Sequence, residues 1–193
     1  MAVVKANAYG HGLVPVATAA AEAGAERLGV ALLSEAVALR KAGLTLPLHI
    51  LSETPLNDVD LIARYNLIAT VYSEKMLLAL AQAGQKSGWP LRIHLKVDTG
   101  MHRVGASPAE ALALYQQAKR YPQLMVEGIF THFACADNPK NKFTKQQLDA
   151  LLSLKSKIKV PIWHCANSAA TLYLPKTHLN MVRVGISMYG LKP

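Results

Sequence analysis

The chain has 193 residues, of which 51% are hydrophobic and 17% are charged, and its formal net charge is +9. This length suits one compact domain with a sizeable core, no apolar run is long enough to span a bilayer, and the first residues lack the organisation of a signal peptide. The positive charge makes a nucleic-acid-binding module an alternative, but aromatic residues are only 6% of the chain and do not alternate with the basic ones, which argues against a surface for stacking bases.

Short apolar, β-branched runs alternate along the chain with segments rich in alanine and leucine. The predicted strands are Val3–Lys5, Leu28–Ala31, Leu48–Leu51, Ala69–Tyr72, Ile93–Asp98, Val126–His132, Ile162–His164 and Met181–Ile186. The predicted helices between them are Val14–Ala23, Ser34–Ala42, Pro55–Tyr65, Ser73–Ala83, Ser107–Lys119, Lys145–Lys157 and Ser168–Leu172. Strand–helix alternation with eight strands predicts a closed (β/α)8 barrel of the α/β class, and a doubly wound open sheet is the alternative.

Capping residues support several of these helices. Ser34, Ser73 and the pair Ser107-Pro108 each stand where a helix is expected to begin, and the proline suits a first helical turn. Glycines stand where helices are expected to stop, at Gly24, Gly43, Gly84 and Gly88. Cys135 and Cys165 are too few for a disulfide framework and lack the spacing of zinc ligands, so we expect no metal and a reduced, cytoplasmic location.

Lys5 ends the first predicted strand, and a glycine-bracketed turn follows it at Gly10 and Gly12. A lysine held in a dry cleft loses its hydration and can act as a nucleophile toward a carbonyl carbon. The alternative is a surface lysine at the end of an edge strand. The residues at the other strand ends have to decide between the two interpretations.

Ionisable side chains recur at the carboxyl ends of the predicted strands, where the chemistry of such barrels lies. His94, Lys96 and Asp98 alternate with apolar residues and should share one face. Because unpaired burial would cost several kcal/mol each, Lys96 and Asp98 should form a buried ion pair or serve a ligand. Other strands end near His132, His164 and Arg183. A single buried histidine is more often structural, but their combination on one rim predicts a site.

A phosphate site is predicted on the same rim. Ser168 opens a helix after the seventh strand, and Gly185-Ile186 follows Arg183 in the eighth. Backbone N–H groups at this part of a barrel commonly bind phosphate. A lysine and a phosphate site on one rim indicate pyridoxal 5'-phosphate (PLP), which carries an aldehyde and a phosphate.

Five segments resemble the alanine racemase family in order and spacing. They are Val4–Gly12 (VKANAYGHG), Lys96–Gly105 (KVDTGMHRVG), Thr131–Phe133 (THF), Asn167–Ala169 (NSA) and Arg183–Gly190 (RVGISMYG). The resemblance covers the chain from end to end. It implies a PLP-binding barrel of fold type III, with residues 1–193 as one incomplete domain, truncated at both ends and lacking the C-terminal β domain.

Residue roles follow from the resemblance alone. It implies that Lys5 holds PLP as an aldimine and acts as one of two catalytic bases, and that Arg183 contacts the pyridine nitrogen with His132 behind it. Arg103 contacts PLP and the substrate carboxylate, Met101 lines the substrate site, and Lys96 is a candidate for carbamylation that orients Arg103. The phosphate is held by Tyr9, Ser168, Gly185 and Ile186, with Asn167 nearby.

The resemblance also implies an isomerase that interconverts L-alanine and D-alanine and supplies D-alanine for peptidoglycan. The second base is a tyrosine of the partner subunit's C-terminal domain in a homodimer, so we expect residues 1–193 alone to racemise poorly or not at all. A single-domain PLP-binding homeostasis protein and a racemase of another small amino acid, such as serine, are alternatives. No membrane or nucleic-acid partner is expected.

Overall fold

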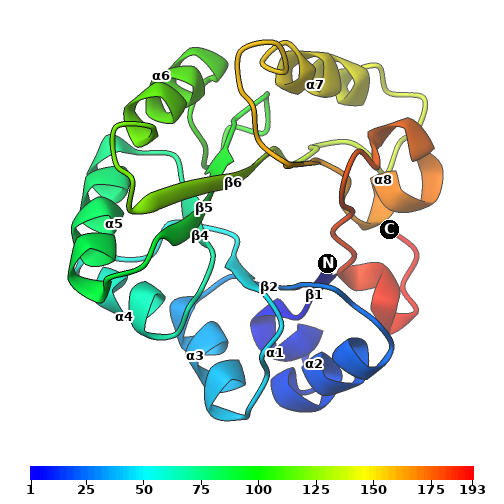
Figure 1. Cartoon of the computed structure of the whole chain (residues 1–193). Helices are drawn as coiled ribbons and strands as arrows, with labels where there is room; N and C mark the ends of the chain where they lie inside the picture. The colour runs from blue at the N-terminus through cyan, green and yellow to red at the C-terminus, as the bar shows by residue number, and fades with distance from the viewer.

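The computed structural model describes residues 1–193, in which parallel strands line the centre and helices form the outer ring (Figure 1). The strands are β1 (Ala2–Val3), β2 (Leu28–Val30), β3 (Leu48–Ile50), β4 (Ala69–Val71), β5 (Leu91–Lys96), β6 (Leu124–Phe130) and β7 (Ile162–His164). The α-helices are α1 (Lys5–Tyr9), α2 (Leu13–Glu22), α3 (Leu33–Lys41), α4 (Val59–Arg64), α5 (Glu74–Ser87), α6 (Pro108–Ala118), α7 (Phe143–Leu152) and α8 (Ser168–Tyr173). Short 3-10 helices are η1 (Leu56–Asp58), η2 (Pro175–Thr177) and η3 (Ile186–Tyr189).

Two parallel sheets make up the central wall, in the orders β1-β2-β3 and β4-β5-β6-β7. A single bridge between His49 and Ile68 joins them, and another between Ala2 and Val184 brings the last part of the chain back to β1. The backbone N–H of Val3 donates to the carbonyl of Val184 at 2.8 Å across this second junction. The arrangement agrees with the predicted barrel class.

The predicted eighth strand, Met181–Ile186, does not form. Its backbone turns toward the loop after β7, where Arg183 N–H donates to the carbonyl of Ala166 at 3.0 Å. A single bridge at Val184 is its only ladder contact, and η3 begins at Ile186. The apolar, β-branched pattern of this segment therefore marks a barrel-closing segment rather than a regular strand.

The first predicted strand is also shorter than Val3–Lys5, because β1 ends at Val3 and Lys5 begins α1. In α1 the residues Ala6 to Tyr9 have φ between 52° and 55°, so this turn is left-handed. Left-handed helical turns are rare for residues with a Cβ, because that atom crowds the following carbonyl. The turn reverses the chain and brings both Lys5 and Tyr9 to the same rim of the barrel.

Most predicted helix boundaries are close to those observed. Ser107 and Ser73 are N-caps whose hydroxyl oxygens accept backbone N–H groups, at 3.3 Å from Glu110 and 3.2 Å from Met76. Ser34 is not a cap, because α3 begins one residue earlier. Gly84 does not end its helix either: it lies inside α5, which stops at Gly88 with φ of 79°, while a Cβ on Gly84 would lie 2.9 Å from the carbonyl oxygen of Gln123.

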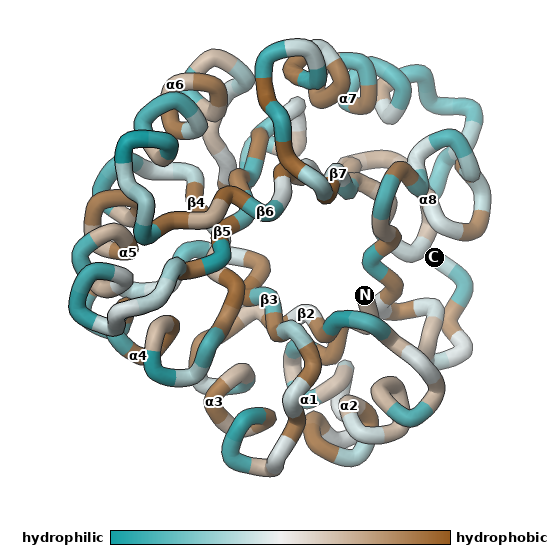
Figure 2. The backbone as a smooth tube through the Cα atoms, in the orientation of Figure 1, coloured by the Kyte–Doolittle hydropathy of each residue, from teal (hydrophilic) through white to brown (hydrophobic).

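The helices bury their apolar faces against the strands, and their outer faces are more hydrophilic (Figure 2). The barrel interior also contains fully buried polar side chains, among them His49, His94 and His164. Cys135 and Cys165 are free thiols. None of the helices combines the length and the apolar character needed to cross a membrane.

Candidate active site

A cavity of about 650 Å³ opens at the carboxyl ends of the strands. Its walls come from the turn after β1, the ends of β5 and β6, the start of α8 and the barrel-closing segment. Every site residue named from the family resemblance lines it: Lys5, Tyr9, Lys96, Met101, Arg103, His132, Asn167, Ser168, Arg183, Gly185 and Ile186. His94, Asp98 and His164, which the strand-end pattern also placed on this rim, do not line it. Side chains separated by most of the chain length are thus brought to one space.

Lys5 and Tyr9 reach the cavity from the left-handed turn. Lys5 is half-buried. The backbone N–H of Ala6, the next residue, donates to Glu35 Oε1 at 2.6 Å, and Asn7 Oδ1 accepts the backbone N–H of Leu13 at 2.8 Å. These side-chain contacts fix both ends of the turn that presents the lysine.

At one end of the cavity, Tyr9, Ser168 and Gly185 come together. Ser168 Oγ accepts the backbone N–H of Gly185 at 2.9 Å, which ties the barrel-closing segment to the start of α8. A Cβ on Gly185 would lie 2.5 Å from the Tyr9 hydroxyl oxygen, so only glycine leaves room for the phenol here. Asn167 caps α8, its Oδ1 accepting the Ala170 N–H at 3.0 Å. Burial raises the pKa of Tyr9, which stays a neutral hydrogen-bond donor.

Arg183 lies buried at the base of the cavity. Its Nη2 donates to the carbonyls of Thr131 at 2.8 Å and Cys165 at 3.2 Å, and contacts His132 Nδ1 at 3.3 Å. Burial, helped by the Arg183 charge, lowers the pKa of His132 to about 3, so this imidazole is neutral and can accept. Burial lowers the pKa of Arg183 to about 10, which still leaves the guanidinium charged near neutral pH.

Lys96 lines the same cavity and forms no ion pair with a carboxylate. Its Nζ donates to the carbonyl of Leu51 at 3.3 Å and lies 5.5 Å from the centre of the Phe130 ring. Burial, with repulsion from Arg103 and Arg183, lowers the pKa of Lys96 to about 8. The buried Lys96–Asp98 ion pair offered as one alternative from the sequence does not form, because Asp98 serves the loop that follows.

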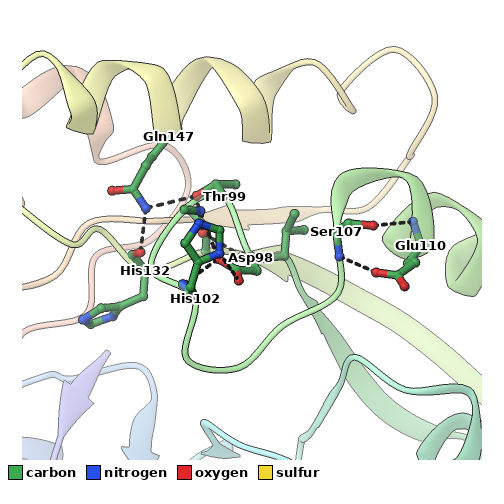
Figure 3. Close-up of polar contacts among 10 residues, drawn as sticks. Asp98, Thr99, His102, Ser107, Glu110, His132 and Gln147 are labelled. Atoms are coloured by element: carbon green, nitrogen blue, oxygen red, sulfur yellow. Dashed lines mark hydrogen bonds and ion pairs between the residues drawn. The ribbon is translucent and has the colours of Figure 1, made fainter.

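Asp98 organises that loop, which carries Met101 and Arg103 to the cavity (Figure 3). Its Oδ1 accepts the backbone N–H groups of Gly100 at 2.9 Å and His102 at 3.1 Å. Gly105, at φ of 139°, passes so close that a Cβ would lie 2.7 Å from the Asp98 nitrogen. These contacts fix the backbone of the loop, so that the side chain of the exposed Arg103 starts from a defined position and reaches the cavity.

Gln147, from α7, joins the loops that follow β5 and β6 (Figure 3). Its Nε2 donates to Thr99 Oγ1 at 3.3 Å and to the carbonyl of His132 at 3.2 Å, while its Oε1 accepts the Ala134 N–H at 2.9 Å. The side chain is fully buried. One amide thereby fixes the spacing between two walls of the cavity.

The buried His49, His94 and His164 are close enough to suggest a metal centre, with candidate ligand atoms within 4.8 Å of one another. Five of their six ring nitrogens already have hydrogen-bond partners, however. His94 Nδ1 and His164 Nε2 are hydrogen-bonded to each other at 2.9 Å, and His49 Nε2 faces Thr70 Oγ1 at 3.0 Å. Only His49 Nδ1 has no partner. The hydrogen-bonded arrangement favours a structural network over metal ligation.

The sequence analysis did not identify the apolar walls of the cavity or the role of Glu35, which supports the turn after Lys5. Phe130 and Phe133 form walls of the cavity, and Ala31 and Leu51 line it from the ends of β2 and β3. The rule that sites lie at strand ends could have identified Ala31 and Leu51. Glu35 has no such signal, because its contact with Ala6 depends on the left-handed turn.

Comparison with known proteins points to one family. A family model described as alanine racemase, N-terminal domain, matches residues 1–193. Alanine racemase 1 of Oceanobacillus iheyensis is 44% identical over 199 residues, covering 100% of this chain and 53% of the relative. The alanine racemase of Halothermothrix orenii is 42% identical over 198 residues, covering 100% and 52%. The chain therefore spans about half the length of these curated relatives.

Solved structures give the same result. The alanine racemase of Clostridium difficile 630 superposes with a TM-score of 0.96 at 34% identity, over 100% of this chain and 52% of that chain. The alanine racemase of Bacillus anthracis, solved with bound L-Ala-P, superposes with a TM-score of 0.91 at 39% identity, over 100% of this chain and 51% of that one.

Proposed function

The chain belongs to the alanine racemase family, and from that premise we propose that residues 1–193 form the PLP-binding barrel domain of an enzyme that interconverts L-alanine and D-alanine. One observation carries the proposal: the residues that the family resemblance assigns to the cofactor and substrate all line a single cavity, with Lys5 on its wall. In this proposal the full-length enzyme is a cytoplasmic homodimer that supplies D-alanine for peptidoglycan.

The donor set fits PLP at both of its polar ends. Tyr9 and Ser168 offer hydroxyl groups beside Gly185 and Ile186, with Asn167 adjacent, and the missing Cβ of Gly185 keeps this end open. We assign this end to the phosphate. Arg183, at the base of the cavity, is assigned to the pyridine nitrogen. When bound, PLP withdraws electron density from the α carbon of an attached amino acid.

Arg183 determines how strongly the ring can accept those electrons. A guanidinium stays charged and donates hydrogen bonds without giving up a proton, so the ring nitrogen stays unprotonated. With PLP bound, an unprotonated ring nitrogen would make the cofactor a weaker electron acceptor and so would disfavour side reactions such as transamination. The neutral His132 stands behind Arg183 and accepts from its Nη2, which supports the orientation of the guanidinium.

Lys5 Nζ is proposed to remove a proton from, or return one to, the α carbon of alanine on one face. Arg103 holds the substrate carboxylate, and Met101 limits the space beside it. Racemisation also requires a base on the opposite face. The family resemblance assigns that base to a tyrosine of a C-terminal domain in the partner subunit, so the activity is proposed for the full-length enzyme.

Lys96 is proposed to become carbamylated and orient Arg103. The ammonium of Lys96 first loses one proton to water, and the neutral amine then attacks CO2 and releases a second proton. A cation beside Arg103 and Arg183 thereby becomes a carbamate anion. Loss of the repulsion between the Lys96 ammonium and the two arginines favours the carbamylated form.

The test is a visible spectrum of the full-length protein with PLP, followed by borohydride reduction and mapping of the modified lysine by mass. We expect the modification at Lys5 and conversion of L-alanine to D-alanine. Lys5→Ala should abolish both, whereas Lys41→Ala, an exposed lysine on α3, should change neither. Modification elsewhere, or unchanged racemisation by Lys5→Ala, would refute the proposal. A panel including serine separates the alanine enzyme from a racemase of another small amino acid, and complete inactivity with retained PLP favours the homeostasis protein.

A further inference from the structure

The guanidinium of Arg183 is buried, yet it forms no ion pair with a carboxylate. Its contacts are two backbone carbonyls and two imidazoles, those of His132 and His164. A buried cation normally requires a paired anion or a full set of acceptors. Arg183 uses acceptors, so the lone pairs of those imidazoles must point at it.

One of the imidazoles begins a hydrogen-bond chain that leads through the barrel interior to a carboxylate. Arg183 Nη1 lies 3.0 Å from His164 Nδ1, and His164 Nε2 lies 2.9 Å from His94 Nδ1. His94 Nε2 lies 3.0 Å from Glu127 Oε2. Glu127 also accepts two hydrogen bonds from Arg27, at 2.8 and 3.1 Å.

The two ends of this interior chain permit a single direction of donation. Arg183 can only donate, so His164 Nδ1 accepts and its Nε2 carries the hydrogen. His94 Nδ1 then accepts, and its Nε2–H donates to Glu127. The contacts with His94 and Arg27 lower the pKa of Glu127 to about 2, so it is an ionised acceptor. Every member of the chain is satisfied in this arrangement.

The fold is locally adapted to hold these groups. Glu127 occupies the point where the β5–β6 register shifts, since Ile93 pairs with Val126 and His94 with Gly128. Bulges of this kind redirect a side chain, here toward the interior. A Cβ on Gly128 would lie 2.5 Å from His94 Cε1, so glycine gives that imidazole its place. The His164 ring stacks on Phe130, with centroids 4.6 Å apart.

We propose that Glu127 and His94 are positioning residues for Arg183. They act through His164, because the chain of hydrogen bonds leaves His164 Nδ1 free of a hydrogen and able to accept from Arg183 Nη1. The inference rests on the proposed function only in taking Arg183 as the contact of the pyridine nitrogen. Neither Glu127 nor His94 lines the cavity. Their effect on the reaction is therefore indirect: they affect how the Arg183 guanidinium is oriented and hydrogen-bonded.

Two substitutions that break the same ion pair test the proposal in the full-length enzyme. Glu127→Gln removes the ionised end of the interior chain, whereas Arg27→Gln leaves it ionised. We expect Glu127→Gln to lower kcat about tenfold with little change in KM and to shift the visible absorbance of bound PLP. Arg27→Gln should leave both near those of the unsubstituted enzyme. Equal changes in kcat and spectrum for the two variants would overturn the proposal, because a purely structural ion pair would affect them alike.

A second measurement does not depend on PLP. ¹⁵N NMR of histidine-labelled protein without cofactor reports which ring nitrogen carries the hydrogen. We expect the Nε2–H tautomer for both His94 and His164. An Nδ1–H tautomer at His164 would overturn the interior chain even in an active enzyme. Absence of PLP binding, by contrast, would overturn the proposed function, whereas the histidine tautomers would still decide whether the interior chain exists.

Discussion

The carboxylate of Glu35 accepts the backbone N–H of Ala6 at 2.6 Å, and so joins the first turn of α3 to the residue that follows Lys5. The other oxygen of Glu35 accepts the N–H groups of Ala31 at 2.8 Å and Leu32 at 3.0 Å. One side chain thus caps its own helix and holds the turn that presents Lys5.

That turn requires such a contact. Each non-glycine residue in the left-handed helical region costs roughly 1–2 kcal/mol, and Ala6 to Tyr9 all adopt it. Charge-assisted hydrogen bonds to a carboxylate contribute about 1.5–3 kcal/mol each. Contacts of the Glu35 kind are therefore large enough to offset a substantial part of the backbone strain.

We predict that Glu35→Gln misplaces Lys5. The amide presents an N–H₂ group to at least one backbone N–H, so the turn relaxes and kcat falls about tenfold, with a loss of roughly 1–3 kcal/mol in the free energy of unfolding. Urea unfolding and the kinetics of the proposed racemase reaction, both measured on the full-length enzyme, report the two effects. Glu74→Gln is the matched control, since Glu74 lies in the first turn of α5 and contacts Gln117 instead of the cavity rim. Similar kinetics in the two variants would contradict a positioning role for Glu35.

Tyr9 and Gly185 should be energetically coupled. Gly185→Ala adds a methyl group 2.5 Å from the Tyr9 hydroxyl, which must move, and we expect PLP to bind about tenfold more weakly. Tyr9→Phe removes that oxygen and one of the hydrogen-bond donors that we propose for the phosphate. The double variant should bind PLP better than the sum of the single losses predicts, because the clash is gone. Absorbance titration with PLP measures all the affinities, and strictly additive losses would show that the two residues do not meet.

Much of this arrangement could be predicted from the sequence. Periodicity located the strands through β7 and the helices α2 to α8, and the strand-end rule with the family resemblance identified the polar residues and Met101 of the cavity but not most of its apolar lining. The left-handed turn could not be predicted, because Ala6, Ala8 and Tyr9 disfavour it, a single asparagine does not specify a whole turn, and tertiary contacts impose it. Glu127 was missed because its inward direction depends on a register shift that periodicity does not reveal.

Carbamylation of Lys96 should depend on pH in a defined direction. Burial and the nearby arginines lower the pKa of Lys96 to about 8, and only the neutral amine reacts with CO2. Raising the pH from 7 to 8.5 increases the neutral fraction from about one tenth to about three quarters. The ¹³C NMR signal of the carbamate in ¹³C-bicarbonate buffer should rise accordingly. Lys96→Arg supplies the background from other amines, and a signal that survives in that variant would assign the modification elsewhere.

Gln147 provides a test of how the loops after β5 and β6 are held at a fixed spacing. Gln147→Leu removes the donor to Thr99 and the His132 carbonyl and the acceptor of the Ala134 N–H, so buried groups lose their partners at a cost of about 1–3 kcal/mol. Because the loop carrying Met101 and Arg103 then keeps only the Thr99–Thr131 hydrogen bond as its side-chain contact with the β6 side, we expect KM of the full-length enzyme for alanine to rise more than kcat falls. Gln146→Leu, its exposed neighbour on α7, should leave stability and KM close to those of the unsubstituted enzyme. Steady-state kinetics with thermal unfolding distinguishes the outcomes: a loss of stability without a change in KM would make Gln147 a structural contact only, whereas a selective rise in KM would assign it to the geometry of substrate binding.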